Sequence, residues 1–314
     1  MRSASDIFGE GGSALGIGTA ALAVPYGAPG SERPAPDRAR ARRTLLAAVE
    51  RGVRFIDTAP AYGEAESLVG AVLGDRADCV IATKVAVPRG GWEELSPEQT
   101  RVHIRASAEA SLRALRRERL DVLQVHNADE ALVRRGAVGE ALAELRDSGV
   151  AAMTGASVYG EQDALAVIAS AAFETVQVAY SALDRRPERR VLPAAAAERT
   201  PVIARSLLLR GVLSPSGRGL DGPFAPLAAA ADTVRRAFDA SWEELPGAAV
   251  AFVLARAGVS RALLGPRDES ELAALLDQAE RFRDAAAKLE LPPHGLPDWL
   301  LDPSRWPQEA SVGG

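Results

Sequence analysis

The chain of 314 residues alternates eight short apolar segments with longer segments in which apolar residues recur at helical spacing. The short segments are almost entirely apolar, which is typical of parallel strands buried on both faces. Eight strand-helix units in succession predict an α/β protein with a single domain over residues 1–314, a (β/α)8 or TIM barrel. The predicted strands are residues 13–22, 53–56, 79–85, 120–125, 151–158, 175–180, 202–209 and 261–265.

The segments between these strands are predicted helices. They are residues 40–51, 64–73, 97–117, 130–145, 163–172, 187–198, 227–242 and 247–258, and a last helix begins at Asp268. A doubly wound sheet is the alternative fold, but it has a GxGxxG turn after its first strand, and Gly16, Gly18 and Thr19 do not form one. Proline, glycine and two tryptophans after residue 290 predict an extended C-terminal tail, residues 291–314.

Composition limits the classes of function. The formal charge is -5 and the basic residues are spread along the chain, so we expect no nucleic-acid partner. No apolar run reaches the about 18 residues of a membrane-spanning helix, and the N-terminal segment lacks a secretory-signal pattern. Cys79 is the only cysteine, which excludes an internal disulfide and a cysteine metal cage. We therefore expect a cytoplasmic protein without a membrane partner or a metal, and the oligomeric state stays open.

Polar side chains follow the second, third and fourth predicted strands where each strand ends. Asp57 ends the second strand and Tyr62 lies in the turn after it, Lys84 lies near the end of the third, and His126 follows the fourth. An ammonium group in an apolar strand needs a partner, because desolvating it costs several kcal/mol, and Asp57 is the candidate. The carboxyl ends of barrel strands meet on one face, so we expect the four side chains to converge there.

This set of residue types suits proton transfer to or from an alcohol oxygen. A free phenol has a pKa of about 10, too high for ready proton donation at neutral pH. We expect the Lys84 ammonium to lower the pKa of Tyr62, with Asp57 keeping the lysine charged and His126 orienting a carbonyl group. Acyl transfer is disfavoured, because no serine or cysteine nucleophile accompanies His126.

Five motifs of the chain resemble the aldo-keto reductase superfamily, in the order of that family. They are FIDTAPAYG at 55–63, ATKV at 82–85, QVHN at 124–127, VQVAYSALDRR at 176–186 and LGPRDESEL at 264–272. The resemblance covers residues 15 to about 278. It implies a (β/α)8 barrel that uses NADP(H), or in some members NAD(H), to interconvert an alcohol and a carbonyl compound such as an aldehyde, a ketone or a sugar. It also implies that the tail folds over the barrel mouth.

The resemblance also implies roles for particular residues. Tyr62 would be the general acid/base, tuned by Lys84 and Asp57, and His126 would orient the carbonyl. Residues implied to bind the cofactor are Gly18, Thr19, Asp57, Ser157, Gln177, Arg205, Ser206, Gly265, Arg267 and Glu271. Of these, Ser157 and Gln177 would hold the nicotinamide carboxamide, and Arg267 would meet the adenosine phosphate. Candidate substrate contacts are Tyr26, Trp92 and Asn127, although Tyr26 also suits a surface position and Trp92 a core or rim position.

Several positions differ from the commoner pattern of that family. Val158 stands where asparagine is usual, Arg205 stands where an aromatic ring often stacks on nicotinamide, and Ala274-Leu275 replace a Glu-Asn pair that contacts adenine. Glu271 would either repel a 2′-phosphate or form a capping box with Asp268. The choice between NADP and NAD stays open. So do two other functions: a non-redox barrel enzyme such as a dehydratase or epimerase, and a cofactor-sensing regulatory subunit.

Overall fold

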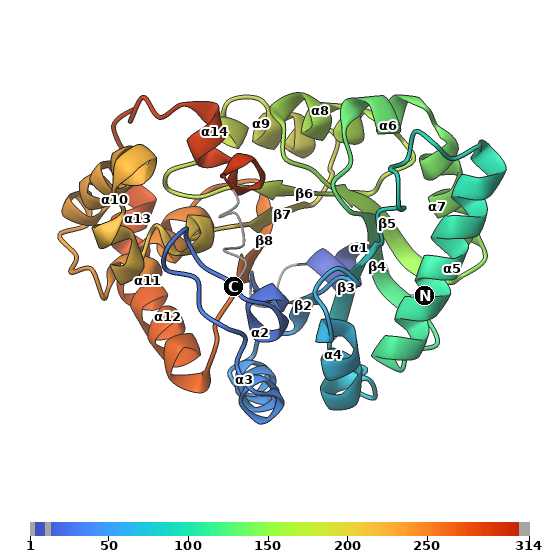
Figure 1. Cartoon of the computed structure of the whole chain (residues 1–314), viewed down its shortest axis with the longest axis horizontal. Coiled ribbons are helices and arrows are strands. Elements are labelled where there is room, and N and C mark those ends of the chain that lie inside the picture. Colours follow the sequence, from blue (N-terminus) through green and yellow to red (C-terminus); the bar gives the residue numbers. More distant parts are fainter. Residues whose placement is uncertain (1–3, 10–13, 308–314) are drawn as a thin grey trace, which may run out of the picture.

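The computed structural model describes residues 4–9 and 14–307. Eight parallel strands close into a barrel in sequence order, and β8 is hydrogen-bonded back to β1 (Figure 1). This confirms the predicted (β/α)8 barrel. The strands are β1 (Leu15–Gly18), β2 (Phe55–Asp57), β3 (Val80–Val85), β4 (Leu120–Val125), β5 (Ala151–Ser157), β6 (Thr175–Ala179), β7 (Val202–Arg205) and β8 (Val259–Leu264).

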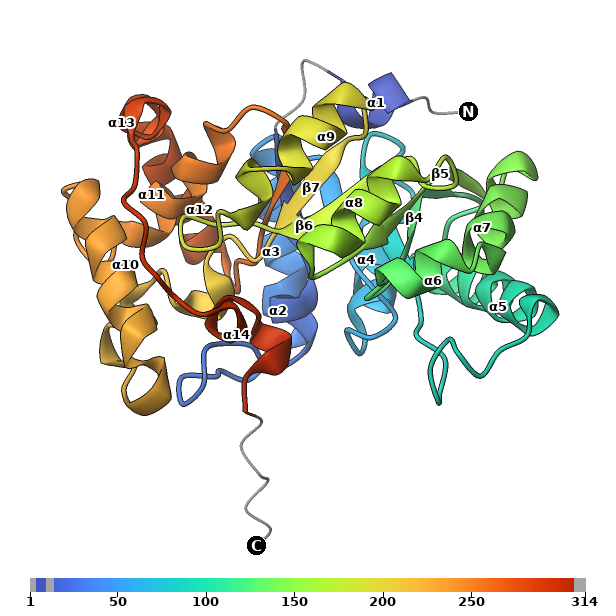
Figure 2. The same cartoon turned by 90° about the horizontal axis from the view of Figure 1, so that it is seen from above.

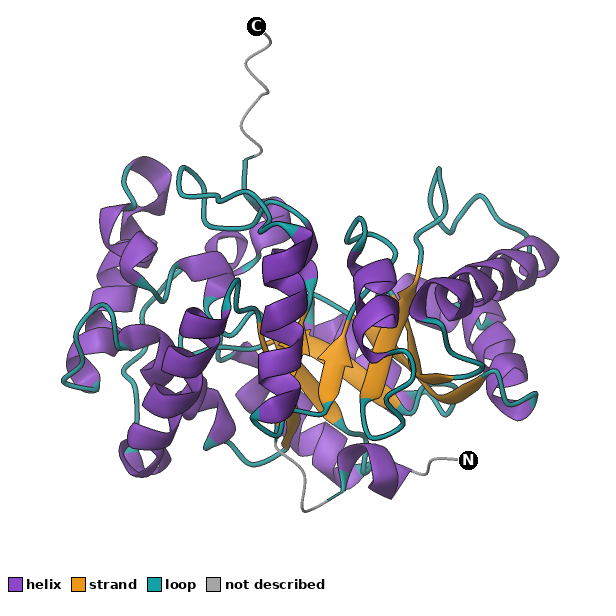
Figure 3. Ribbon diagram, turned by 90° about the horizontal axis from the view of Figure 1, so that it is seen from below, coloured by secondary structure: helices purple, strands orange, loops and turns teal. Residues whose placement is uncertain are grey.

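Helices surround the strands on the outside of the barrel (Figure 3). They are α1 (Ala4–Phe8), α2 (Ala20–Ala23), α3 (Arg38–Glu50), α4 (Ala65–Leu73), α5 (Pro97–Leu115), α6 (Glu130–Arg134), α7 (Ala137–Asp147), α8 (Glu161–Ala169), α9 (Val191–Ala197), α10 (Ala225–Ala237), α11 (Leu245–Leu254), α12 (Glu269–Arg281), α13 (Arg283–Lys288) and α14 (Asp298–Leu301). Short 3-10 turns lie at Arg186–Glu188, Leu209–Gly211, Pro215–Gly219, Gly222–Phe224 and Pro303–Arg305. Within the described residues, every helix is too short or too polar to cross a membrane.

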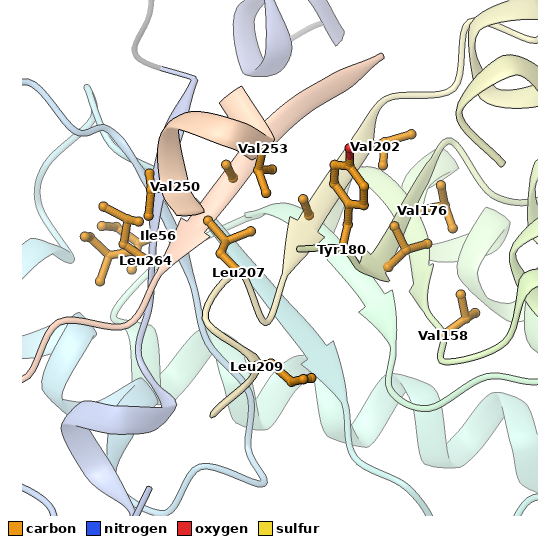
Figure 4. Packing of buried hydrophobic residues seen from close by; sticks show 14 of the residues in the cluster. Ile56, Val158, Val176, Tyr180, Val202, Leu207, Leu209, Val250, Val253 and Leu264 are labelled. Carbon is orange, nitrogen blue, oxygen red and sulfur yellow. The ribbon is translucent and has the colours of Figure 1, made fainter. Parts of the chain in front are cut away.

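The wall of strands separates two apolar cores. Because successive side chains of a strand point to opposite faces, Phe55 belongs to the inner core and Ile56 to the outer one. The outer core lies between strands and helices, and includes Val250 and Val253 of α11 with Leu264 of β8 (Figure 4). Asp57, two residues after Phe55, therefore faces the inside of the barrel near the carboxyl end of β2.

Helix α1 closes the amino-terminal end of the barrel, which periodicity in so short a segment could not predict. Ile7 is 1% exposed within the inner core, and the Phe8 ring lies 5.8 Å from that of Phe55. Arg261 Nη2 donates to the Ile7 carbonyl oxygen at 2.7 Å. Figure 2 shows α1 and α14 at opposite ends of the barrel. Only the carboxyl end is left for a site inside the barrel.

The predicted first strand, residues 13–22, is too long. Strand β1 ends at Gly18, and Ala20–Ala23 forms the helical turn α2; Ser13 lies outside the described residues. The backbone N–H and the hydroxyl of Thr19 both donate to the Asp57 carbonyl oxygen, at 2.9 and 3.0 Å. These two bonds occupy the carbonyl oxygen of Asp57, the last residue of β2, and β1 does not continue along β2 beyond this point.

Two other predicted elements are interrupted where residues adopt a positive φ. The predicted helix at 130–145 is two helices, α6 and α7, separated by Gly136 with φ 78°, a conformation that glycine adopts without a Cβ penalty. The predicted strand at 202–209 ends at Arg205, because Ser206 has φ 60° and turns the chain out of the sheet. Apolar residues continue across both breaks, so the hydrophobic periodicity of the sequence does not reveal either of them.

The C-terminal segment runs from α13 to the carboxyl end of the barrel (Figure 2). Trp306 is 5% exposed, and its ring lies 5.5 Å from that of Phe224, which precedes α10. Pro303 and Ser304 line the cavity described below. Residues 308–314 of the predicted tail lie outside the described residues.

Candidate active site

Lys84 and Asp57 form a buried ion pair inside the barrel. Lys84 Nζ lies 2.8 Å from each carboxylate oxygen of Asp57 and donates to the Thr58 carbonyl oxygen at 3.0 Å. The two side chains are 0% and 4% exposed. Burial lowers the pKa of Lys84, but the Asp57 carboxylate and the Tyr62 phenol outweigh it, and the net shift is upward. The ion pair expected from the sequence is present, and Lys84 stays charged.

Tyr62 and His126 lie next to this ion pair. Lys84 Nζ is 5.3 Å from the centroid of the Tyr62 ring. The rings of Tyr62 and His126 meet edge to face, with centroids 5.8 Å apart and planes at 87°. Tyr62 is positioned by the turn after β2, in which its N–H donates to the Ala59 carbonyl oxygen, and His126 directly follows β4. The four side chains thus converge at the carboxyl ends of β2, β3 and β4.

The direction of the pKa shift at Tyr62 corrects the expectation from sequence. Burial of the phenol raises its pKa, and this effect exceeds the lowering by the nearby Lys84 charge. The predicted fall in pKa was wrong because burial of the phenol outweighs the Lys84 charge, and the Asp57 charge adds to the rise. The Tyr62 phenol therefore keeps its proton at neutral pH.

His126 is neutral in this environment. Burial lowers its pKa to about 3, and the positive charges of Lys84 and Arg205 act in the same direction. A neutral imidazole has one N–H donor and one acceptor nitrogen. His126 can therefore hydrogen-bond a carbonyl oxygen beside the Tyr62 phenol without adding a charge.

A chain of hydrogen bonds fixes the amide of Gln177 behind this group. Gln177 Nε2 donates to Asp57 Oδ1 at 2.8 Å and to Gln124 Oε1 at 3.2 Å, and Gln177 Oε1 accepts from Ser157 Oγ at 3.2 Å. Because the Asp57 carboxylate only accepts, the amide must present its nitrogen to it. One lone pair of Gln177 Oε1 is left, on an amide that lines the cavity.

Gln124 reaches its second partner across a glycine. In the barrel register Gln124 pairs with Gly155, which in turn pairs with Thr175. Gln124 Nε2 lies 3.5 Å from Thr175 Oγ1, and a Cβ on Gly155 would lie 2.2 Å from that same oxygen. Gly155 thus leaves room for the Thr175 hydroxyl. Sequence reasoning missed Gln124, although a glutamine inside an apolar strand is the same signal that pointed to Lys84.

A cavity of about 860 Å³ opens above these residues. Seven of the eight strands, all except β3, contribute lining residues from the strand itself or from the segment after it. Of the sequence-predicted site residues, those that line it are Gly18, Tyr26, Asp57, Tyr62, His126, Asn127, Gln177, Arg205, Ser206, Gly265, Arg267 and Glu271. Lys84, Thr19 and Ser157 lie behind this lining, almost fully buried.

Trp92 lies outside the cavity lining. Trp92 is 6% exposed, and its ring packs edge-on against that of His103 of α5, with the two ring centroids 5.6 Å apart. The structure therefore places Trp92 in the core and not among the residues that could contact a substrate in this cavity.

The cavity also contains Tyr159 and Arg210, which sequence reasoning did not single out. The Arg205 guanidinium carbon lies 4.2 Å from the Tyr159 ring centroid, and that of Arg210 lies 5.2 Å from the Tyr26 ring centroid. Tyr159 comes two residues after Ser157, the last residue of β5. The rule that polar residues follow strand ends would have found it.

The part of the cavity next to α12 is built on a helix N-terminus. Asp268 caps α12 by accepting from the Glu271 N–H at 2.9 Å, and Glu271 Oε2 accepts from the Arg267 N–H at 2.8 Å. In a capping box the Glu271 carboxylate would also accept from the Asp268 N–H, but here it accepts from the Arg267 N–H instead. Arg267 Nη2 donates to the Pro34 carbonyl oxygen at 2.6 Å, which ties this region to the loop between α2 and α3.

The sequence model of the Aldo/keto reductase family matches residues 14–286, which is most of the chain. The chain belongs to this family. Within the described part of this aldo/keto reductase, no group of three or more His, Cys, Asp or Glu side chains could hold a metal ion.

Individual aldo/keto reductases are similar to the chain at moderate identity. Aldo-keto reductase YhdN of Bacillus subtilis is 31% identical over 209 residues, which are 64% of this chain and 60% of that protein. The chain thus aligns with somewhat less than two thirds of the length of its curated relatives.

Solved structures match over a larger share of the chain. Aldo-keto reductase AKR11C1 from Bacillus halodurans, in its holo form, has a TM-score of 0.67 and 25% identity, covering 88% of this chain and 93% of that one. The glycerol dehydrogenase AKR11B4 from Gluconobacter oxydans, with a TM-score of 0.65, 23% identity, and coverage of 89% and 94%, shares the fold.

Proposed function

We propose that the chain is an NAD(P)(H)-dependent oxidoreductase that interconverts a carbonyl compound and an alcohol. The observation that carries this proposal is the buried Asp57–Lys84 pair next to Tyr62 and His126, at the base of a cavity of about 860 Å³. Membership of the aldo/keto reductase family supports it, as does the holo form of the similar Bacillus halodurans protein.

In this proposal Tyr62 is the proton donor in carbonyl reduction. A reduced nicotinamide cofactor, held by the cavity residues named below, would supply the hydride for the carbonyl carbon. The phenol proton moves to the carbonyl oxygen as the C=O double bond is reduced, which completes the alcohol. The Lys84 ammonium stabilises the phenolate that remains, and Asp57 holds Lys84 in place. Solvent then returns a proton to Tyr62.

His126 orients the carbonyl oxygen. Its ring meets Tyr62 edge to face, so an oxygen between the two can accept from both the phenol O–H and an imidazole N–H. The neutral form of the ring leaves Tyr62 as the group that donates the proton. His126 is thus a positioning donor, with no net proton transfer of its own.

The cavity residues fit an extended dinucleotide with phosphate groups. The volume lies within the roughly 300–1,000 Å³ of ligand pockets. Hydroxyl and guanidinium donors that suit phosphate oxygens line it, namely Ser206, Ser214, Ser216, Arg267 and Ser270. The remaining lone pair on Gln177 Oε1 suits the N–H of a carboxamide. Gly18, Gly265 and Glu271, which also line the cavity, complete the proposed cofactor contacts. Thr19 and Ser157 are buried behind the lining and would support the cofactor site through their bonds to Asp57 and Gln177.

Titration with NADPH and NADH, followed by quenching of tryptophan fluorescence, tests the cofactor assignment. We expect micromolar binding of one of the two. Reduction of an aldehyde, ketone and sugar panel, followed by loss of reduced-nicotinamide absorbance, then tests the activity. Tyr62→Phe should lower kcat/KM by about 10²–10⁴-fold and leave cofactor affinity unchanged.

Tyr180→Phe is the matched control, because it also removes one phenol oxygen. Tyr180 donates to Glu188 Oε1 at 2.5 Å, and its ring lies outside the cavity lining. Absence of binding by either nucleotide would contradict the proposal and favour a non-redox enzyme that uses the same acid/base group. Tight binding with no turnover of any panel member would favour a cofactor-sensing subunit.

A further inference from the structure

Arg205 brings a cationic group into the cavity beside the proposed reaction centre. It ends β7 and lines the cavity together with Tyr62 and His126. Within residues 4–9 and 14–307, its hydrogen-bond partners are two neutral oxygens, Val158 O and Ser206 Oγ. It forms no ion pair there, unlike Lys84, whose ammonium is paired with Asp57.

The guanidinium of Arg205 is held in one orientation. Nη2 donates to Val158 O at 3.0 Å and Nη1 to Ser206 Oγ at 3.2 Å, and one face of the group lies on the Tyr159 ring at 4.2 Å. A guanidinium has five N–H donors, so three remain after these two bonds. A planar, oriented group with unused donors is well suited to a carboxylate, which accepts two parallel N–H bonds.

The other charges at this part of the cavity are compensated. Asp57 and Lys84 neutralise each other, and Arg210 Nη2 lies 3.1 Å from Glu32 Oε1. Arg205 therefore leaves a net positive charge here, although the whole chain has a formal charge of -5. The Arg205 charge contributes to the pKa shifts of both Tyr62 and His126, as expected for a charge near both.

On the basis of the carbonyl reduction proposed above, we infer that the preferred substrate carries a carboxylate that binds Arg205 while its carbonyl oxygen meets Tyr62 and His126. This differs from the cofactor-stacking role that the family resemblance implies for this position. Tyr159 already covers one face of the guanidinium, and the unused hydrogen-bond donors of the group lie along its N–H edge.

Matched pairs of aldehydes test this inference. Succinic semialdehyde and butanal have the same chain length, and 4-carboxybenzaldehyde and 4-methylbenzaldehyde the same ring; in each pair only one member has a carboxylate. We expect the wild type to reduce the carboxylate member of at least one pair with a kcat/KM about ten- to a hundredfold higher, the range of a hydrogen-bonded charge. Arg205→Gln should abolish this preference, because kcat/KM should fall at least about tenfold more for the carboxylate member than for the neutral member of the pair.

Controls separate this role from others. Arg205→Lys keeps the charge without the planar fork and should retain part of the preference. Arg236→Gln removes a charge that is exposed on α10 and paired with Asp232, and should retain all of it. Thermal melting of each variant reports whether it folds.

Three results would overturn the inference. One is equal kcat/KM for both members of both pairs in the wild type. Another is an Arg205→Gln variant that binds NADPH more weakly and loses rate equally on neutral and anionic aldehydes, because Arg205 would then serve the cofactor. If the wild type reduces neither member of either pair nor any aldehyde, ketone or sugar of the panel, the proposed function itself fails and the inference with it.

Discussion

The Lys84 ammonium lies 2.8 Å from both carboxylate oxygens of Asp57, in a barrel interior where the two side chains are 0% and 4% exposed. A buried ion pair of this kind contributes little net stability, but losing one partner leaves an uncompensated charge. Asp57 and Lys84 therefore depend on each other for the stability of the fold as well as for the proposed chemistry.

Asp57→Asn should lower the free energy of unfolding by about 3–5 kcal/mol, because the Lys84 ammonium would lose its charged partner. Adding Lys84→Met should restore much of that loss, since the double variant buries no charge at this position. Urea unfolding of the wild type, both single variants and the double variant measures the coupling. An Asp57→Asn protein as stable as the wild type would show that water reaches Lys84.

The raised pKa of Tyr62 predicts the pH dependence of reduction. The phenol must be protonated to donate, so kcat/KM for reduction should be flat through neutral pH and fall only in an alkaline limb, above the about 10 of a free phenol. Alcohol oxidation needs the phenolate and should rise over the same range. Lys84→Met should move both limbs to still higher pH. A Tyr62-dependent fall in reduction between about pH 6 and 8 would contradict this account.

His126 should make the folded protein less stable in mild acid. Its pKa is lowered to about 3 in the fold, against about 6.5 in the unfolded chain. Between those values the unfolded state binds a proton that the native state does not, so the free energy of unfolding falls as pH falls. In His126→Asn the unfolded chain has no imidazole at this position to take up a proton, so the free energy of unfolding should fall less steeply from about pH 7 to about pH 4. Equal slopes in urea titrations of the two proteins would count against a buried, neutral His126.

Gln124→Leu should destabilise the polar chain behind the site. It would leave a Gln177 N–H and the Thr175 hydroxyl without their partner, at a cost of about 1–3 kcal/mol for buried groups. Since Gln177 would also lose one of the three bonds that hold its amide, we expect weaker cofactor binding in the fluorescence titration. A variant with lower stability and unchanged nucleotide affinity would limit Gln124 to a structural role.

Ile7→Ala tests the plug at the amino-terminal end of the barrel. Ile7 is 1% exposed in the inner core, and truncating a buried isoleucine costs about 2–5 kcal/mol. The melting temperature should fall, while nucleotide affinity well below that temperature should not change, because α1 closes the end opposite the cavity. Loss of affinity without loss of stability would show that the two ends of the barrel are coupled.

The linear sequence was sufficient for the parts of this protein that depend on local chemistry. The apolar runs predict strands because each is buried on both faces, and Lys84 in one of them requires an anionic partner, which the structure identifies as Asp57. Asp57, Tyr62 and His126 could be placed at one end of the barrel because they follow strands whose ends share a face.

Tertiary structure alone decided what depends on the environment of each group. The pKa of Tyr62 is raised because surrounding segments bury the phenol, and sequence carries no measure of that desolvation. The hydrogen bond between Gln177 and Asp57 joins residues 120 positions apart in the sequence. One face of the Arg205 guanidinium is covered by the ring of Tyr159, which follows a different strand. Such effects arise from distances between segments, which are fixed only when the barrel closes.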